Sequence, residues 1–170
     1  DVPPGLNGVI AADTAIGAVH GDEGFFHYGG HDATVLARTR TFEDVWHLIR
    51  HGHLPSAEEA ARFRAVVAAG RRVPDELRPI IAAVASTQAS LLSKLRSVIS
   101  LAAGFDPVID IDSEERHAQA LRLAAMVPSI LAALYRAGAG LSIVEPNQAL
   151  GHAAAYLHEA QIPVVGASLE

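Results

Sequence analysis

Residues 16–55, IGAVHGDEGFFHYGGHDATVLARTRTFEDVWHLIRHGHLP, decide the fold because they pass from strand-like to helical sequence. Two short apolar runs, 16–19 and 25–28, flank a turn that contains Gly and Asp, and this pattern predicts a β-hairpin. From residue 33 onward, apolar residues recur at helical spacing almost to the end of the chain. A lone hairpin is marginally stable in water, so we expect it to lie against larger structure. The predicted fold class is mainly α, with a small N-terminal β-hairpin.

Capping signals predict where the helices begin and end. Thr41 with Asp44 resembles a capping box, and the helix that it opens should end near Gly52. Ser56 with Glu59 is a second capping box, which opens a helix to about residue 70. A third helical segment is expected to start at residues 74–76. The remaining helices are expected over 91–104, 113–137 and 147–160.

Two of these helices carry further expectations. The helix over 91–104 has one apolar stripe, formed by Leu91, Leu92, Leu95, Val98, Ile99 and Leu101. In the longest helix, Pro128 removes one backbone donor, so we expect a kink or a break there. Residues 105–112 are expected to be a connector, with Ser113 as the cap of the long helix.

Composition narrows the class of protein. The chain has 170 residues, 50% of them hydrophobic and 19% charged, which excludes an intrinsically disordered chain. It contains 32 Ala and only 5% aromatic residues, a bias that favours closely packed helices. The absence of Cys excludes disulfides, thiolate zinc sites and a Cys nucleophile. A net charge of −6 disfavours nucleic acid as a partner.

The N-terminus lacks the basic and apolar regions of a signal peptide. The longest apolar run, 123–135, is shorter than the ~20 residues that span a bilayer. We therefore expect a soluble, cytoplasmic protein without a membrane partner.

Histidines give one candidate metal site. His47 and His51 are spaced i, i+4 on a predicted helix, and His53 follows two residues later. Two imidazoles on one helix face can bind Zn²⁺ or Ni²⁺, but a stable site needs further ligands. The alternative is a helix end at which cationic His interacts favourably with the helix dipole. We favour this alternative and predict no metal site.

Glycines and carboxylates give no clearer site. The Gly-rich segment does not match phosphate-loop or dinucleotide patterns, and turns explain its glycines, Gly21, Gly24, Gly29 and Gly30. An acidic cluster lacks the spacing of a calcium loop, and helix capping accounts for part of it: Asp106, Asp110, Asp112, Glu114 and Glu115. No Ser occupies a nucleophile motif. From the residues alone, the chain is a helical domain without a visible active site.

Six segments in the first third of the chain form an ordered series: 5–10, 14–16, 21–24, 26–32, 42–48 and 51–55. This series resembles the N-terminal part of the citrate synthase family, including its 2-methylcitrate synthase branch. Family members typically carry a Gly-Leu-x-Gly-Val segment, a Gly-x-x-Gly hairpin, a Tyr-x-Gly-x-Asp segment and a helix that ends in Gly-x-Leu-Pro. A weaker likeness continues to about residue 160.

The resemblance implies a portion of the helical large domain of a citrate synthase. We expect residues 1–32 to be the N-terminal segment with the hairpin. Residues 33–160 would be the helical part of the large domain, and the tail 161–170 a truncation point. The family also implies a homodimer or homo-oligomer.

The family reaction condenses acetyl-CoA, or propionyl-CoA, with oxaloacetate to give citrate or 2-methylcitrate in the tricarboxylic acid cycle. A carboxylate base and two oriented donors in a closed cleft carry it out. In the family these groups lie in His-Gly-x-Asn-Ala-Ser, His-Gly-Gly and Gly-His-Arg type motifs. The pairs at 20–21, 51–52 and 151–152 lack the flanking residues of these motifs. No catalytic, cofactor-binding or metal-binding residue is therefore assigned, and no tightly bound cofactor is expected.

Two functions remain open. The first is a portion of a citrate synthase-like enzyme, inactive by itself, whose co-substrate in the intact enzyme is acetyl-CoA. The second is a non-catalytic helical dimerisation or interaction module derived from the same fold.

Overall fold

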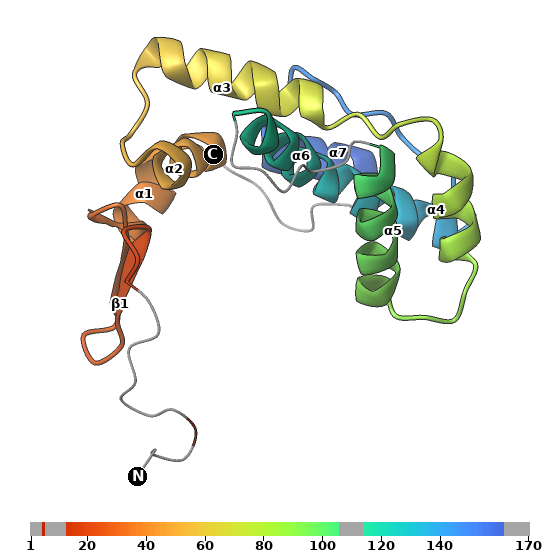
Figure 1. The fold of residues 1–170 in the computed structure, drawn as a ribbon, viewed down its shortest axis with the longest axis horizontal. Coiled ribbons are helices and arrows are strands. Elements are labelled where there is room, and N and C mark those ends of the chain that lie inside the picture. The colour runs from red at the N-terminus through yellow and green to blue at the C-terminus, as the bar shows by residue number, and fades with distance from the viewer. Residues whose placement is uncertain (1–4, 6–12, 106–113, 162–170) are drawn as a thin grey trace. The chain divides into compact units, whose positions relative to one another are not determined.

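A computed structural model describes residue 5, residues 13–105 and residues 114–161 (Figure 1). The chain divides into two compact units, with the division between Ala60 and Ala61. Within the described residues there are seven helices and one small antiparallel sheet, so the mainly α fold with an N-terminal hairpin is confirmed.

The first unit contains the sheet and two short helices. Its elements are β1 Gly17–His20, β2 Phe25–Tyr28, β3 His31–Asp32, α1 Ala33–Thr39 and α2 Phe42–His51. The strands lie in the order β1-β2-β3, with Gly17 opposite Tyr28 and His27 opposite Asp32. The sequence predicted only the first two strands, because a strand of two residues has no periodicity to detect.

Glycine at position 29 allows the third strand to form. The residue has φ +53°, a left-handed conformation that side chains with a Cβ rarely adopt. A Cβ at this position would lie 2.8 Å from Cδ1 of Leu48, which is fully buried in α2. The turn between β2 and β3 therefore packs closely on α2.

The two helices of this unit begin at side-chain caps. Asp32 Oδ1 accepts hydrogen bonds from the backbone N–H groups of Thr34 at 2.7 Å and Val35 at 3.1 Å. The capping box predicted at Thr41 is confirmed, because its Oγ1 accepts from Asp44 N and Asp44 Oδ2 accepts from Thr41 N, both at 3.2 Å. Helix α2 ends, as expected, at Gly52 with φ +79°.

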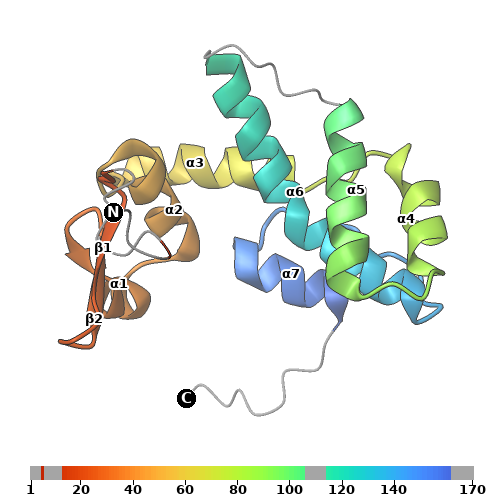
Figure 2. The same cartoon turned by 60° about the horizontal axis from the view of Figure 1, so that its bottom comes forward.

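Five further helices follow: α3 Ala57–Gly70, α4 Leu77–Ala85, α5 Leu91–Phe105, α6 Glu114–Gly138 and α7 His152–Ala160 (Figure 2). The capping box at the start of α3 is confirmed, with Ser56 N donating to Glu59 Oε2 at 2.8 Å and Glu59 N donating to Ser56 Oγ at 3.3 Å. Helix α3 crosses the division between the units, and its last residue, Gly70, lies against Ala125 of α6.

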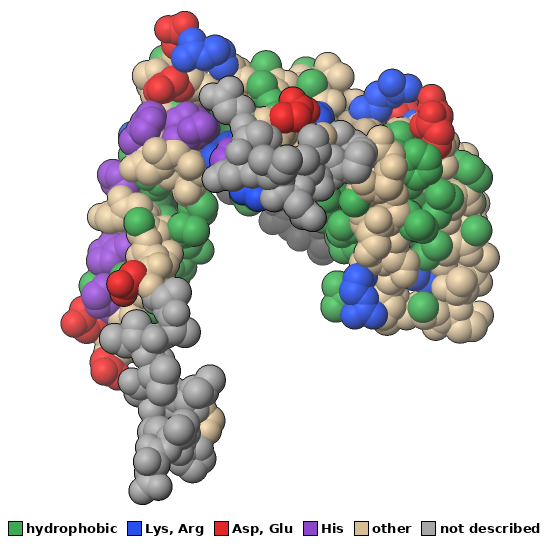
Figure 3. All heavy atoms as spheres, viewed as in Figure 1, with side chains coloured by type: hydrophobic (Ala, Val, Ile, Leu, Met, Phe, Trp, Pro, Cys, Tyr) green, Lys and Arg blue, Asp and Glu red, His purple; other side chains and the backbone are tan. Residues whose placement is uncertain are grey.

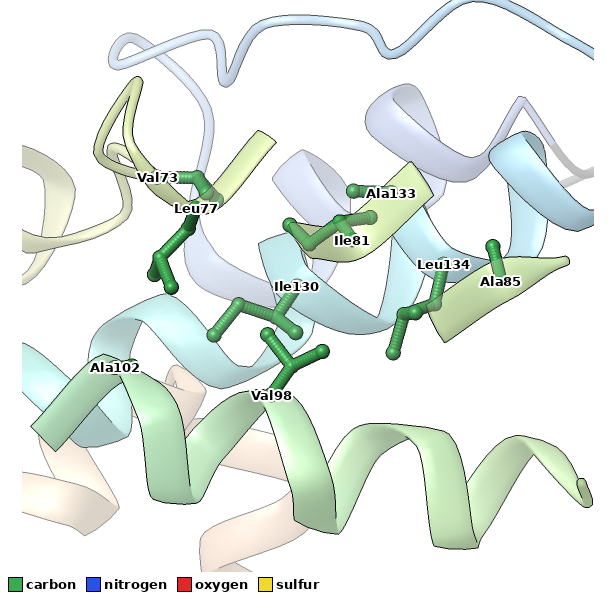
Figure 4. Close-up of a cluster of buried hydrophobic side chains, with 9 residues drawn as sticks. All are labelled: Val73, Leu77, Ile81, Ala85, Val98, Ala102, Ile130, Ala133 and Leu134. Atoms are coloured by element: carbon green, nitrogen blue, oxygen red, sulfur yellow. The ribbon is translucent and has the colours of Figure 1, made fainter. Parts of the chain in front are cut away.

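The core of the second unit lies between α4, α5 and α6 (Figure 4). Side chains at i, i+4 spacing face it from each helix, as the sequence periodicity predicts. Its buried members are Val73, Leu77, Ile81, Ala85, Val98, Ala102, Ile130, Ala133 and Leu134. Small residues occur on all three helices in this cluster, which allows close packing, as the Ala-rich composition indicates.

The apolar stripe predicted on α5 is only partly correct. Val98 and Ala102 are buried in the core, and Leu95 and Ile99 pack against it. Leu92, in contrast, is 76% exposed, and other members of the predicted stripe are exposed as well: Leu91 and Leu101. Leu92 and Leu101 are displaced from the i, i+3, i+4 face that the core takes, whereas Leu91 shares that face but is the first residue of α5.

Two predictions about the helices need correction. A kink or a break was expected at Pro128, and the break is wrong because α6 continues through this residue. Helix α7 begins at His152 rather than at residue 147. Residues 147–150 form a turn in which Asn147 Oδ1 accepts from Ala149 N at 3.0 Å. Arg71, distant in sequence, holds the backbone carbonyls of this turn, and local sequence does not reveal such an interaction.

By length and composition, the Glu115–Gly138 stretch of α6 is long and apolar enough to cross a membrane. The expectation from the sequence considered only the shorter apolar run inside it. In the structure, α6 packs against α4, α5 and α7. Its Ile130 and Leu134 side chains are buried in the core, and these contacts explain its apolar character as that of a core helix.

Some predictions lie outside the described residues. These are the greater part of the connector at 105–112, the cap at Ser113, and the tail from 162. The domain boundary expected at residue 32 stays a prediction. In the structure, α1 and α2 share one compact unit with the hairpin.

Candidate functional site

The three candidate metal ligands lie together at the end of α2. The ring centroids of His47 and His51 are 4.3 Å apart, and those of His47 and His53 are 5.1 Å apart. His47 Nδ1 lies 3.2 Å from the His53 carbonyl, and His53 Nδ1 lies 3.1 Å from the Leu54 carbonyl. Figure 3 shows histidine side chains on the visible face of the first unit. Among the described residues, no group of three or more metal-ligating side chains is placed to hold a metal ion.

Partial burial and neighbouring positive charge disfavour protonation of His51. The pKa of His51 is lowered, first by partial burial and then by the neighbouring His47, Arg50 and His53. Glu59, at the start of α3, acts in the opposite direction. This environment favours the neutral form of His51, so the cationic histidine expected at this helix end is disfavoured at that residue.

The glycines singled out in the sequence serve turns. Gly24, Gly29 and Gly30 have φ between +53° and +81°, which explains the need for glycine there. Among the acidic residues, Glu115 forms an exposed ion pair with Arg122 at 3.3 Å, and Glu114 begins α6. The aspartates of that cluster lie outside the described residues.

The histidines of the partial family motifs have ordinary structural places. His20, in β1, stacks on Phe25 with ring centroids 4.7 Å apart. His51 belongs to the cluster at the end of α2, and His152 is a buried residue at the start of α7.

A buried polar cluster in the second unit was not anticipated. Arg71 and Glu159 are each 2% exposed, and Ser129 is 3% exposed. Arg71 Nη1 donates to the Asn147 carbonyl at 3.2 Å, and its Nη2 donates to the Leu150 carbonyl at 2.9 Å. The only sequence signal for this cluster is a charged residue, Glu159, inside the helix predicted over 147–160. The sequence did not indicate that residues from α6, α7 and the segment before α4 would meet.

Three atoms of this cluster are buried without a hydrogen-bond partner in the described part of the chain: Arg71 Nε, Ser129 Oγ and Glu159 Oε1. An unpaired buried polar group costs about 1–3 kcal/mol. Burial raises the pKa of the Glu159 carboxyl above its ordinary value of 4.5, against the opposing effects of Ser129, Arg71 and His158. The arrangement holds helices together and keeps a carboxyl out of water.

Comparison with known proteins gives the family. The sequence model described as "Citrate synthase, C-terminal domain" matches residues 5–164. The chain is 35% identical over 158 residues to the citrate synthase of Haloferax volcanii, covering 91% of this chain and 42% of that protein. It is 32% identical over 158 residues to a 2-methylcitrate synthase of Mycobacterium tuberculosis, covering 93% of this chain and 40% of that protein.

Solved structures agree with the sequence comparisons. The chain superposes on the citrate synthase of Pyrobaculum aerophilum with a TM-score of 0.80 and 29% identity, over 92% of this chain and 41% of that one. For the citrate synthase of Thermotoga maritima the TM-score is 0.79, with 25% identity over 92% and 40% of the two chains. The fold is that of a helical portion of these enzymes, and the chain belongs to the citrate synthase family. It spans about two fifths of the length of the curated relatives it matches.

Proposed function

We propose that this chain is the N-terminal portion of a citrate synthase-like enzyme that condenses acetyl-CoA or propionyl-CoA with oxaloacetate. The observation that carries the proposal is the family match over residues 5–164, together with the helical fold shared with solved citrate synthases. In this proposal the chain supplies scaffold, and the groups that form the carbon–carbon bond lie in the rest of the enzyme.

The distribution of polar groups supports a scaffold role. Condensation needs a base and two donors that converge on the reacting carbons in a dry cleft. The buried polar side chains of the second unit instead bind backbone carbonyls, as Arg71 does, or lie between α6 and α7, as Glu159 does. The three family motifs that contain the catalytic residues are missing from the sequence. We therefore infer that the chain alone is inactive.

The proposal extends to partners and location. We infer a homodimer or homo-oligomer, with oxaloacetate and acyl-CoA as substrates of the intact enzyme, and acetyl-CoA as co-substrate rather than a tightly bound cofactor. We also place the protein in the cytoplasm, with neither nucleic acid nor membrane as a partner, as its acidic composition and the core role of α6 favour.

A chimaera tests the scaffold role. In the Haloferax volcanii citrate synthase, the segment matched by this chain is replaced by residues 5–164. We expect a chimaera that unfolds cooperatively and releases thiol from acetyl-CoA when oxaloacetate is present. The matched control is the same chimaera with Leu134→Asp in the core, which should not fold. A chimaera that folds cooperatively but binds neither substrate would contradict the proposal.

The exposed apolar side chains of α5 favour a second function, a non-catalytic interaction module derived from the same fold. Leu91, Leu92, Leu101 and Phe105 are all exposed. Sedimentation velocity of the 170-residue chain, with and without Leu92→Lys, tests this second function. The module requires a stable dimer of the chain alone that the substitution dissociates. A monomer would contradict the module.

A further inference from the structure

Helix α7 depends on packing for its stability. It has nine residues, and its N-cap residue, Gly151, makes no side-chain capping bond. Isolated helices of this length are marginal in water, so tertiary contacts must hold it in place. Those contacts are with α6 (Figure 2), and α7 buries Ala155, Glu159 and Ala160. A carboxyl therefore occupies a position in this interface where an apolar residue is usual.

The Glu159 carboxyl meets charged and polar groups from several elements. Ser129 faces it from α6, Arg71 from the segment before α4, and Glu145 from the segment before α7, while His158 adjoins it on its own helix. Its Oε1 atom is buried without a hydrogen-bond partner in the described residues, and Arg71 uses its two terminal nitrogens on backbone carbonyls. Ser129 and the charge of Arg71, whose Nε is also unpaired here, favour the ionised carboxylate, but the loss of solvation on burial outweighs them.

We propose that the Glu159 carboxyl is a proton-operated latch, which holds α7 against α6 when protonated and loosens that packing when ionised. Burying the neutral acid costs less free energy than burying the carboxylate, and the acid carries an O–H that can donate to Ser129 Oγ, which has no partner among the described residues. Ionisation releases the proton to solvent and leaves a charge in the interface.

The direction of the pH effect follows from burial. Because burial raises the pKa of Glu159, its contribution to the packing of α7 on α6 is fully present below pH 4.5, its ordinary pKa. That contribution is lost as the pH rises through the raised pKa. Within that window the opening equilibrium of α7 changes about tenfold per pH unit, as for any single coupled proton.

Hydrogen exchange of the 170-residue chain tests the latch between about pH 4.5 and about pH 8. Each amide exchange rate is divided by its intrinsic rate at that pH. The resulting values for α7 are then divided by those for α5, so that the contribution of global unfolding cancels. We expect relative opening of α7 to rise with pH, with a limiting slope of about tenfold per pH unit. Glu159→Gln should remove this rise and protect α7 more than the unmodified chain does at high pH. Glu115→Gln, at an exposed glutamate of α6, is the matched control and should keep the rise.

His158→Gln separates the latch from titration of the adjacent imidazole, and it too should keep the pH dependence. If Glu159→Gln does not fold, Glu159→Leu gives the same readout, because an apolar side chain of similar length also removes the charge. A pH-independent ratio of α7 to α5 exchange in the unmodified chain would overturn the proposal. So would a Glu159 variant that keeps the rise.

Discussion

Replacing Gly29 by alanine should destabilise the first unit through two effects that can be separated. The first is backbone strain, because φ is +53° and a left-handed conformation costs a residue with a Cβ roughly 1–2 kcal/mol. The second is contact, because the new Cβ would lie 2.8 Å from Leu48 Cδ1 in a buried position. Overpacking of this kind costs about 1–3 kcal/mol. Reduced freedom of the unfolded chain offsets roughly 0.4–1 kcal/mol.

Gly30→Ala is the matched control. Its φ is +81°, but a Cβ there would have no neighbour within 4 Å, so it carries the strain without the contact. We expect Gly29→Ala to lose about 1–3 kcal/mol more of the free energy of unfolding than Gly30→Ala. Urea unfolding followed by the fluorescence of Trp46, the single Trp of the chain, reports on α2 directly. Equal losses in the two variants would refute the packing argument.

The other predictions concern the core and the histidine cluster. Leu134→Ala should lower the free energy of unfolding in urea by about 2–5 kcal/mol, because the side chain is buried. Leu92→Ala, at an exposed position, should change it by no more than about 0.5 kcal/mol. Similar losses in the two variants would contradict the assigned core. His51 should make the first unit less stable in acid. Because the pKa of His51 is lowered, its contribution to the free energy of unfolding is present above pH 6.5, its ordinary pKa. That contribution is lost as the pH falls through the lowered pKa. His51→Gln should therefore reduce the acid loss of the Trp46-monitored urea midpoint, and an unchanged loss would count against the cluster.

Sequence patterns correctly predicted those structural features that depend on residues a few positions apart. The capping boxes at Thr41 and Ser56 were predicted correctly because their partners lie three residues away. The start of α7 was not, since the Arg71 side chain holds the preceding turn from a distant part of the chain. Of the kink or break expected at Pro128, the break is wrong, because α6 continues through this residue and packs against α4, α5 and α7.

The candidate site shows the same limit. The close approach of His47 and His51 follows from helical spacing, and the structure confirms it. His53 lies beyond the end of α2, and its approach to His47 follows from the turn after Gly52. The buried cluster of Arg71 and Glu159 follows only from the tertiary fold, because its members come from separate elements. The family likeness was visible in the ordered hairpin and helix segments, since these short motifs survive at positions where turns and caps restrict the choice of residue.

The central claim is that this chain is citrate synthase scaffold whose bond-forming groups lie elsewhere. The most direct test is thiol release from acetyl-CoA by the purified 170-residue chain with oxaloacetate, beside the intact Haloferax volcanii citrate synthase under the same conditions. We predict release from the chain at the level of the buffer control. Saturable, oxaloacetate-dependent release that co-purifies with the chain would contradict the account.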